Sequence, residues 1–258
     1  MESEIISKLP EKYRIALYSI INYACISFGN NLFNLTLGGS GGKGKIIEGW
    51  SDLDIYIILF NYDAEQIVSF TKHLNNISIH VGTTYYTLSE LSCNMIDCKT
   101  KVMCYEKQNF NVNPTLYGID IFNLVTHDEI IAADIRNLPN ILHDVRRRYI
   151  DLIGNSDNVV TKPYIKKLLV LLKCILSCYG IFSYGYDTTV LKFNELAEKE
   201  NFDLTPISDF DIMSAINNIE NAKESVTKFS AFVLNFVDKY YQKEGVKNKW
   251  EKELVLEQ

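Results

Sequence analysis

Two aspartates separated by one residue, Asp52 and Asp54, are the residues of this 258-residue chain whose type and spacing best suit a catalytic or metal-binding role. They open a largely apolar segment that predicts a buried strand over 52–60. Residues i and i+2 of a strand point to the same face, so both carboxylates are expected to project together. Such a pair is costly unless solvent or a cation stabilises it, and hard oxygen ligands suit Mg²⁺. The spacing therefore predicts a magnesium site at one edge of a sheet.

A glycine-serine turn, Gly39-Ser40, precedes the aspartates, and ten residues separate Ser40 from Ser51. Backbone N–H groups and a hydroxyl in such a turn can bind phosphate oxygens. The loop 41–45 adds three glycines, which permit close approach to a ligand, and Lys43, which can meet phosphate as a point charge. No Gly-Lys-Ser/Thr opens a helix here, so the loop is not a P-loop. Phosphate beside Mg²⁺ indicates nucleotide chemistry.

The elements that must position these residues alternate between helix and strand in the first half of the chain. Apolar residues at helical spacing predict helices over 10–28 and 64–75, and a capped helix start over 87–91. β-rich segments predict strands over 32–37 and 77–86, the second containing His80 as a structural residue, and a further strand over 101–108. The aspartates should therefore lie within a sheet that helices flank.

Beyond about residue 125, helical spacing replaces β-rich alternation. Helices are predicted over 138–152, 163–178, 190–200, 209–219 and 223–242, and the charged tail from Glu244 is expected to be loose. The fold class is therefore α+β, with a mixed sheet flanked by helices followed by a helical bundle. We expect two domains, 1–125 and 126–258.

Charge and composition indicate which classes of ligand the protein is expected to bind. The net charge is −6 and the sequence pI about 5.3, so a nucleic acid is an unfavoured partner and a cationic small molecule a favoured one. The six cysteines lack zinc-knuckle spacing, and no apolar run approaches the ~20 residues that span a bilayer. With no secretory leader recognised, we expect a cytoplasmic protein with free thiols and no membrane association.

The pattern Gly39-Ser40, a spacer of about ten, then Ser51-Asp52-Leu53-Asp54 before an apolar strand resembles the nucleotidyltransferase superfamily of polymerase-β type. With its helical second half, the layout looks like the small bacterial antibiotic nucleotidyltransferases of the kanamycin type. The helix start around Asp187-Thr188-Thr189 is similar to one in that group.

The resemblance implies a reaction and a cofactor. ATP or another nucleoside triphosphate would bind with Mg²⁺ held by Asp52 and Asp54. Gly39 and Ser40 would contact the triphosphate, with Lys43 and Ser51 as further nucleotide-contacting residues. An acceptor hydroxyl would attack the α-phosphorus and pyrophosphate would leave. The acceptor would be a small cationic antibiotic such as an aminoglycoside, or a lincosamide, and a homodimer is expected in this group.

The sequence leaves several candidates for the residue that accepts the proton of the acceptor hydroxyl. Many members carry a third acid on the next strand, where this chain has only His80, and the antibiotic-modifying group uses a glutamate of the helical domain instead. By position Asp151 is the matching residue, with Asp120 and Glu90 as alternatives. Two other functions stay open: a nucleotidyltransferase toxin acting on tRNA or protein, and an inactive nucleotide-binding module.

Overall fold

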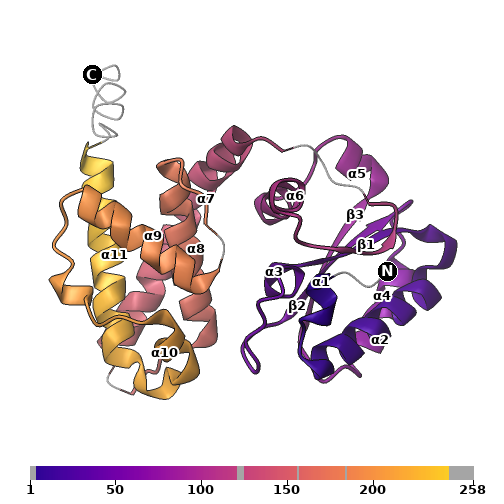
Figure 1. Cartoon of the computed structure of the whole chain (residues 1–258), viewed down its shortest axis with the longest axis horizontal. Coiled ribbons are helices and arrows are strands. Elements are labelled where there is room, and N and C mark those ends of the chain that lie inside the picture. The colour runs from indigo at the N-terminus through magenta and orange to yellow at the C-terminus, as the bar shows by residue number, and fades with distance from the viewer. Residues whose placement is uncertain (1–3, 121–124, 156, 184, 244–258) are drawn as a thin grey trace. The chain divides into compact units, whose positions relative to one another are not determined.

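The chain folds into two units, residues 1–130 and 131–258, in a computed structural model (Figure 1). The structure describes residues 4–120, 125–155, 157–183 and 185–243. The charged tail from Glu244 lies outside the described residues. In the part of the chain that the structure describes, no helix is long and apolar enough to cross a bilayer.

A four-stranded mixed sheet in the order β3-β2-β1-β4 forms the centre of the first unit. Its strands are β1 (Leu32–Gly38), β2 (Leu53–Leu59), β3 (Val81–Thr87) and β4 (Thr115–Gly118). β1 pairs antiparallel with both β2 and β4, whereas β2 and β3 are parallel. The parallel pair is possible because α4 (Ala64–Leu74) provides the crossover between β2 and β3.

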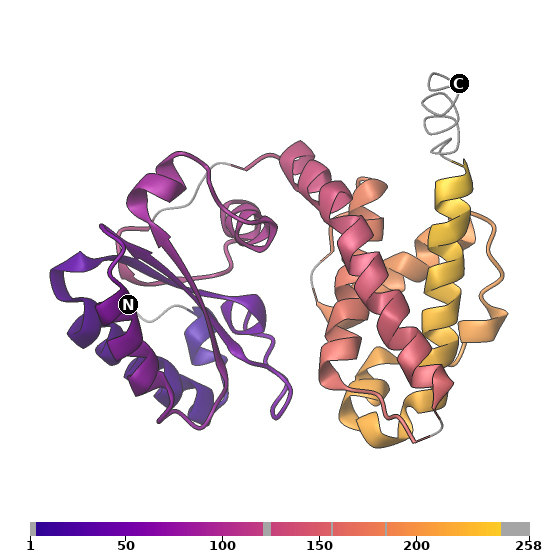
Figure 2. The ribbon, with the colours of Figure 1, turned by 180° about the vertical axis from the view of Figure 1, so that it is seen from behind.

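Helices cover both faces of this sheet (Figures 1 and 2). On one face, Leu53, Ile55 and Ile57 of β2 share a buried core with α2 (Glu11–Phe28) and α4. On the other face, Ile58 of β2 packs in a second core with residues of α5 (Leu88–Ser92) and α6 (Cys98–Phe110). Alternation along β2 therefore sends Asp54 and Tyr56 to the α6 face. The remaining short helices of this unit are α1 (Glu4–Ser7), η1 (Gly29–Asn31) and α3 (Gly39–Gly42).

The strand predicted over 101–108 is wrong, because this segment lies in α6. Its apolar residues form one short run, 102–105, and periodicity alone cannot tell such a run in a strand from a buried helix segment. The deciding signal is the cap: Asp97 accepts a hydrogen bond from the backbone N–H of Thr100. Two boundaries also differ: β2 begins one residue after Asp52, and His80 directly precedes β3 instead of lying within it.

The second unit is helical, and the α+β expectation is confirmed. Its α-helices are α7 (His127–Gly154), which begins in the first unit, α8 (Lys162–Cys178), α9 (Tyr186–Lys199), α10 (Ile212–Asn217) and α11 (Lys223–Lys243), with 3₁₀ turns η2 (Thr205–Ile207) and η3 (Ile219–Asn221). Thr161 caps α8 by accepting from the Tyr164 N–H. α8 is central to the bundle, since Tyr164 donates to Ser230 of α11 and Ser177 hydrogen-bonds Asp134 of α7.

Candidate active site

Asp54 lies near the start of β2 with a glycine opposite it on each neighbouring strand. The antiparallel partner is Gly38 of β1 and the parallel partner is Gly82 of β3. Because neither neighbour carries a side chain, the carboxylate keeps an open approach, and 25% of its side chain is exposed. Asp54 is thus a partly solvated anion on an otherwise buried strand, as the sequence predicted.

Gly39 brings the glycine-serine turn directly against Asp54. Its φ is +60°, which favours glycine, and a Cβ at this position would lie 2.0 Å from Oδ2 of Asp54. Ser40 follows within the single turn α3 and is partly exposed, and its carbonyl accepts hydrogen bonds from the N–H groups of Lys43 and Lys45. The turn and the Asp-x-Asp strand therefore meet in space.

Asp52 precedes β2 and is similarly exposed, at 20% of its side chain. Its Oδ1 lies 3.7 Å from Nδ1 of His80, whose own side chain is 76% exposed. The N–H of Leu53 donates to the His80 carbonyl, which fixes the backbone of the two segments side by side. The two predicted carboxylates therefore both lie at the end of the sheet where β2 and β3 begin.

A lysine that the sequence did not single out contacts Asp54. Lys99 of α6 donates to Asp54 Oδ1 at 2.7 Å, and its Nζ lies 5.9 Å from the centre of the Tyr56 ring. Negative charge gathers at this point: burial raises the pKa of Tyr56 well above its usual value, and the charges of Asp54, Asp97 and Glu106 raise it further. A cation is therefore electrostatically favoured here.

Lys43, a predicted phosphate contact, lies in a buried ion pair. Its Nζ is 2.6 Å from Oε1 of Glu106, and the two side chains are only 11% and 4% exposed. Glu106 also accepts from the Asn113 side-chain amide, while the Asn113 N–H donates to the Gly42 carbonyl. This network ties the loop after the glycine-serine turn to α6. Contact of Lys43 with a phosphate stays a prediction.

Ser51 has a comparable structural environment. It is buried, its hydroxyl accepts from the Ile47 N–H at 2.9 Å, and its carbonyl accepts from the Tyr13 hydroxyl. These bonds close the loop that delivers the chain to Asp52. Contact of Ser51 with a nucleotide stays a prediction, and its hydrogen bonds show a positioning role.

Neither alternative proton acceptor in the first unit lies beside Asp54. Glu90 accepts from the backbone and hydroxyl of Thr87 at the far end of β3, five residues or about 16 Å beyond the partner of Asp54. Asp120 pairs with Lys107 at 2.7 Å next to β4, two strands or about 10 Å from β2. Burial opposes ionisation of Asp120, but the hydrogen bonds from Lys107 and Thr115 outweigh it and lower its pKa.

Asp151 belongs to the second unit, where it is exposed near the end of α7. It lines a surface groove together with Arg148, Asp157 and Tyr164, and its carbonyl accepts from the Asn158 side chain. Its predicted role as base stays a prediction.

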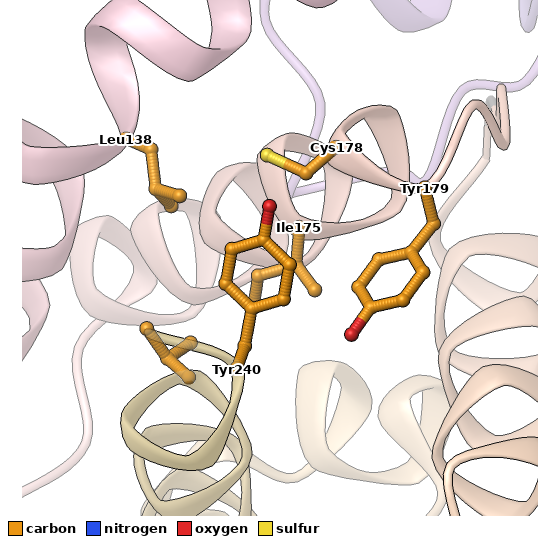
Figure 3. Close-up of a pocket in the computed structure, with 6 residues that line it drawn as sticks. Leu138, Ile175, Cys178, Tyr179 and Tyr240 are labelled. Atoms are coloured by element: carbon orange, nitrogen blue, oxygen red, sulfur yellow. The ribbon is translucent and has the colours of Figure 1, made fainter. Parts of the chain in front are cut away.

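A second pocket of this unit offers no acid-base chemistry. It lies between α7, α8 and α11, is too narrow to admit a water molecule, and is lined by Leu138, Ile175, Cys178, Tyr179, Val237 and Tyr240 (Figure 3). The Tyr240 hydroxyl points toward Cys178, and burial raises the pKa of this thiol to about 11. A thiol this hard to ionise is a packing residue and a poor nucleophile.

The donor set of Asp52 and Asp54 fits Mg²⁺. Among the described residues, no group of three or more His, Cys, Asp or Glu side chains is placed to hold a metal ion. A cation at this point would therefore have these two carboxylates as its acidic protein ligands. Mg²⁺ is usually held by one or two carboxylates and completes its octahedron with water and substrate phosphates. The missing side chain at Gly39 leaves space against Asp54 Oδ2 that a Cβ would fill.

The first unit is a mixed sheet with a glycine-serine turn against an Asp-x-Asp strand, and a helical unit follows it. Among solved structures, the chain is similar to the crystal structure of spectinomycin adenyltransferase AAD(9) from Enterococcus faecialis with ATP and spectinomycin. The TM-score is 0.58 at 13% sequence identity, covering 86% of this chain and 97% of that chain. The resemblance predicted from the sequence motifs is thereby confirmed at the level of fold. No protein-family model and no curated protein matches the sequence.

Proposed function

We propose that the chain catalyses Mg²⁺-dependent transfer of a nucleoside monophosphate from a nucleoside triphosphate, ATP first among them, to a hydroxyl of a small cationic antibiotic, with release of pyrophosphate. The observation that carries this proposal is the close approach of Gly39 to Asp54, which unites a phosphate-binding turn and a carboxylate pair. The AAD(9) structure, which holds ATP and spectinomycin on a similar fold, supports the same reaction class.

Each residue of the proposed site has a role that follows from its position. Asp52 and Asp54 would hold Mg²⁺, which when bound neutralises phosphate charge in an in-line displacement. The turn at Gly39 and Ser40 would bind phosphate oxygens through backbone N–H groups. Ser51 and the Lys43–Glu106 pair would hold the two loops in register. Catalysis would then rest on positioning and charge neutralisation, as in phosphoryl transfer generally.

The acceptor hydroxyl needs a base, and Asp151 is the proposed one. An exposed carboxylate can take the proton as the hydroxyl attacks the α-phosphorus. The groove that Asp151 lines contains a second carboxylate, Asp157, against one cation, Arg148, and the whole chain has a net charge of −6. Both features favour a cationic, polyhydroxylated acceptor over an anionic one.

The test is pyrophosphate release by the full-length protein with Mg²⁺ and ATP, GTP, CTP or UTP, in the presence of spectinomycin, other aminoglycosides, lincosamides or tRNA. Release that depends on one antibiotic, with a mass shift of that antibiotic by one nucleoside monophosphate, is the expected result. Asp54→Asn should abolish release. Asp63→Asn is the matched control, because Asp63 caps α4 and asparagine also caps helices well.

Other outcomes separate the alternatives. Release that depends on tRNA alone would favour the toxin-like nucleotidyltransferase. Binding of Mg²⁺-ATP without pyrophosphate release in the presence of any of these acceptors would favour an inactive nucleotide-binding module. Absence of both binding and release would refute the nucleotide assignment.

A further inference from the structure

We propose that Lys99 is a nucleotide-binding residue whose ammonium moves from Asp54 to a phosphate oxygen when the metal-bound nucleotide enters. This inference rests on the proposed function and adds a residue that neither the sequence motifs nor the fold similarity assigns. It starts from one contact, the 2.7 Å hydrogen bond from Lys99 Nζ to Asp54 Oδ1.

Competition for the same carboxylate drives the move. Asp54 has two oxygens: Oδ1 accepts from Lys99, and Oδ2 faces Gly39. A divalent cation bound to this carboxylate would bring two positive charges to within a few ångströms of the ammonium. Like charges at such a distance repel strongly even at a protein surface. Lys99 would therefore be displaced toward the nearest anion, and the proposed reaction supplies one in the triphosphate.

The side chain of Lys99 is able to move, whereas its backbone is held in place. The side chain is 61% exposed, so its tip meets little packing resistance. Its backbone lies in the first turn of α6, which is held by the Asp97 cap on the Thr100 N–H at 2.7 Å. A flexible four-carbon stem on a fixed helix end lets an ammonium switch partners without a change in fold.

Two other lysines of the first unit, Lys43 and Lys107, are held in ion pairs of their own. Lys43 and Lys107 are 11% and 6% exposed and pair with Glu106 and Asp120. Moving the Lys43 ammonium would leave the buried Glu106 carboxylate uncompensated, and the buried Lys107 ammonium also donates to the Asn113 carbonyl and the Thr115 hydroxyl. Asp54, by contrast, would receive a metal in exchange for Lys99, so Lys99 can follow the phosphate charge at a lower cost than Lys43 or Lys107.

The test compares full-length wild type with Lys99→Met, which removes the charge and keeps an unbranched side chain. Mn²⁺ binding without nucleotide, measured by electron paramagnetic resonance, should tighten by about tenfold, because one unit charge close to a ligand oxygen is removed. Binding of Mg²⁺-α,β-methylene-ATP, measured by calorimetry, should weaken by about tenfold, because a charged hydrogen bond is lost. Tighter metal binding together with weaker nucleotide binding is the result expected if the same ammonium contacts Asp54 in the free protein and a phosphate in the complex.

Two further variants keep the inference falsifiable. Lys101→Met removes a lysine of the same helix whose charge acts on Glu129, and it should change neither constant. Lys99→Arg retains a cation that binds phosphate, and nucleotide affinity should stay within about threefold of wild type. Unchanged nucleotide affinity in Lys99→Met, or an equal loss in Lys101→Met, would overturn the inference while antibiotic-dependent transfer by wild type left the proposed function standing. A wild type that binds neither Mn²⁺ nor nucleotide would overturn both.

Discussion

Gly39→Ala is the substitution that most directly tests whether the glycine-serine turn and Asp54 form one site. The new Cβ would lie 2.0 Å from Oδ2 and 2.9 Å from Cγ of Asp54. Both contacts are shorter than real Cβ atoms show, so the carboxylate or the turn has to retreat by about 1 Å. The positive φ of Gly39 adds backbone strain, since a left-handed conformation costs an alanine about 1–2 kcal/mol.

These two effects predict different magnitudes for stability and for turnover. The unfolding free energy should fall by about 2 kcal/mol, from the strain and the residual contact. Turnover should fall by about 100-fold, because a shift of about 1 Å in a catalytic group costs that much. The measurements are urea unfolding followed by circular dichroism, and kcat and KM for antibiotic-dependent pyrophosphate release.

Gly29→Ala separates strain from contact. Gly29 also has a positive φ, +50°, but a Cβ there would meet nothing within 4 Å. Its ψ of −126° lies outside the left-handed helical region, so alanine there should cost about 1–3 kcal/mol of stability, while turnover should stay at the wild-type value. Turnover of Gly39→Ala within about threefold of wild type would refute the reasoning, as would an equal loss of turnover in Gly29→Ala.

Three further predictions concern other parts of the chain. Glu106→Gln leaves the Lys43 ammonium without its carboxylate in a buried position and should lower the unfolding free energy by about 3 kcal/mol, with a loss under about 0.5 kcal/mol contradicting a buried pair. Because burial raises the pKa of Cys178 to about 11, only about one thiol in a thousand is ionised at pH 8. Iodoacetamide mapping at pH 8 should therefore label exposed Cys93 first, with Cys178 labelling still rising above pH 10, and equal labelling would contradict this. Asp151→Asn should lower turnover by about 100-fold or more with unchanged nucleotide affinity, and near-normal turnover would remove Asp151 as the base.

The sequence could predict that the glycine-serine turn meets the Asp-x-Asp strand, because this contact is local in the chain. Gly39, Asp52 and Asp54 lie within sixteen consecutive residues, and the strand pattern alone places the two carboxylates on one face. The antiparallel register then sets Gly38 opposite Asp54, which carries the turn to the carboxylate. Spacing within one hairpin is the kind of information a single sequence contains.

The residues that the sequence missed, Lys99 and Glu106, both lie on α6. Residues 101–108 of this helix were predicted as a strand, and Lys99 lies just before them. Their partners are distant in the chain: Lys99 meets Asp54 across 45 positions. No local pattern encodes such a contact, and the cap at Asp97 was the signal that could have identified the helix. The single helix α6 therefore carries both Lys99, which contacts Asp54, and Glu106, which pairs with Lys43 of the glycine-rich loop.

This placement also explains why β3 offers no acid. A Cβ on Gly82 would lie 3.3 Å from Asp54 Oδ1, the oxygen that Lys99 already contacts. A carboxylate side chain at position 82 would therefore occupy the space that the Lys99 ammonium uses, and would pair with it instead of taking a proton from an acceptor. Glu90 and Asp120 lie at least about 10 Å away along the sheet, so neither is placed to take a proton beside Asp54.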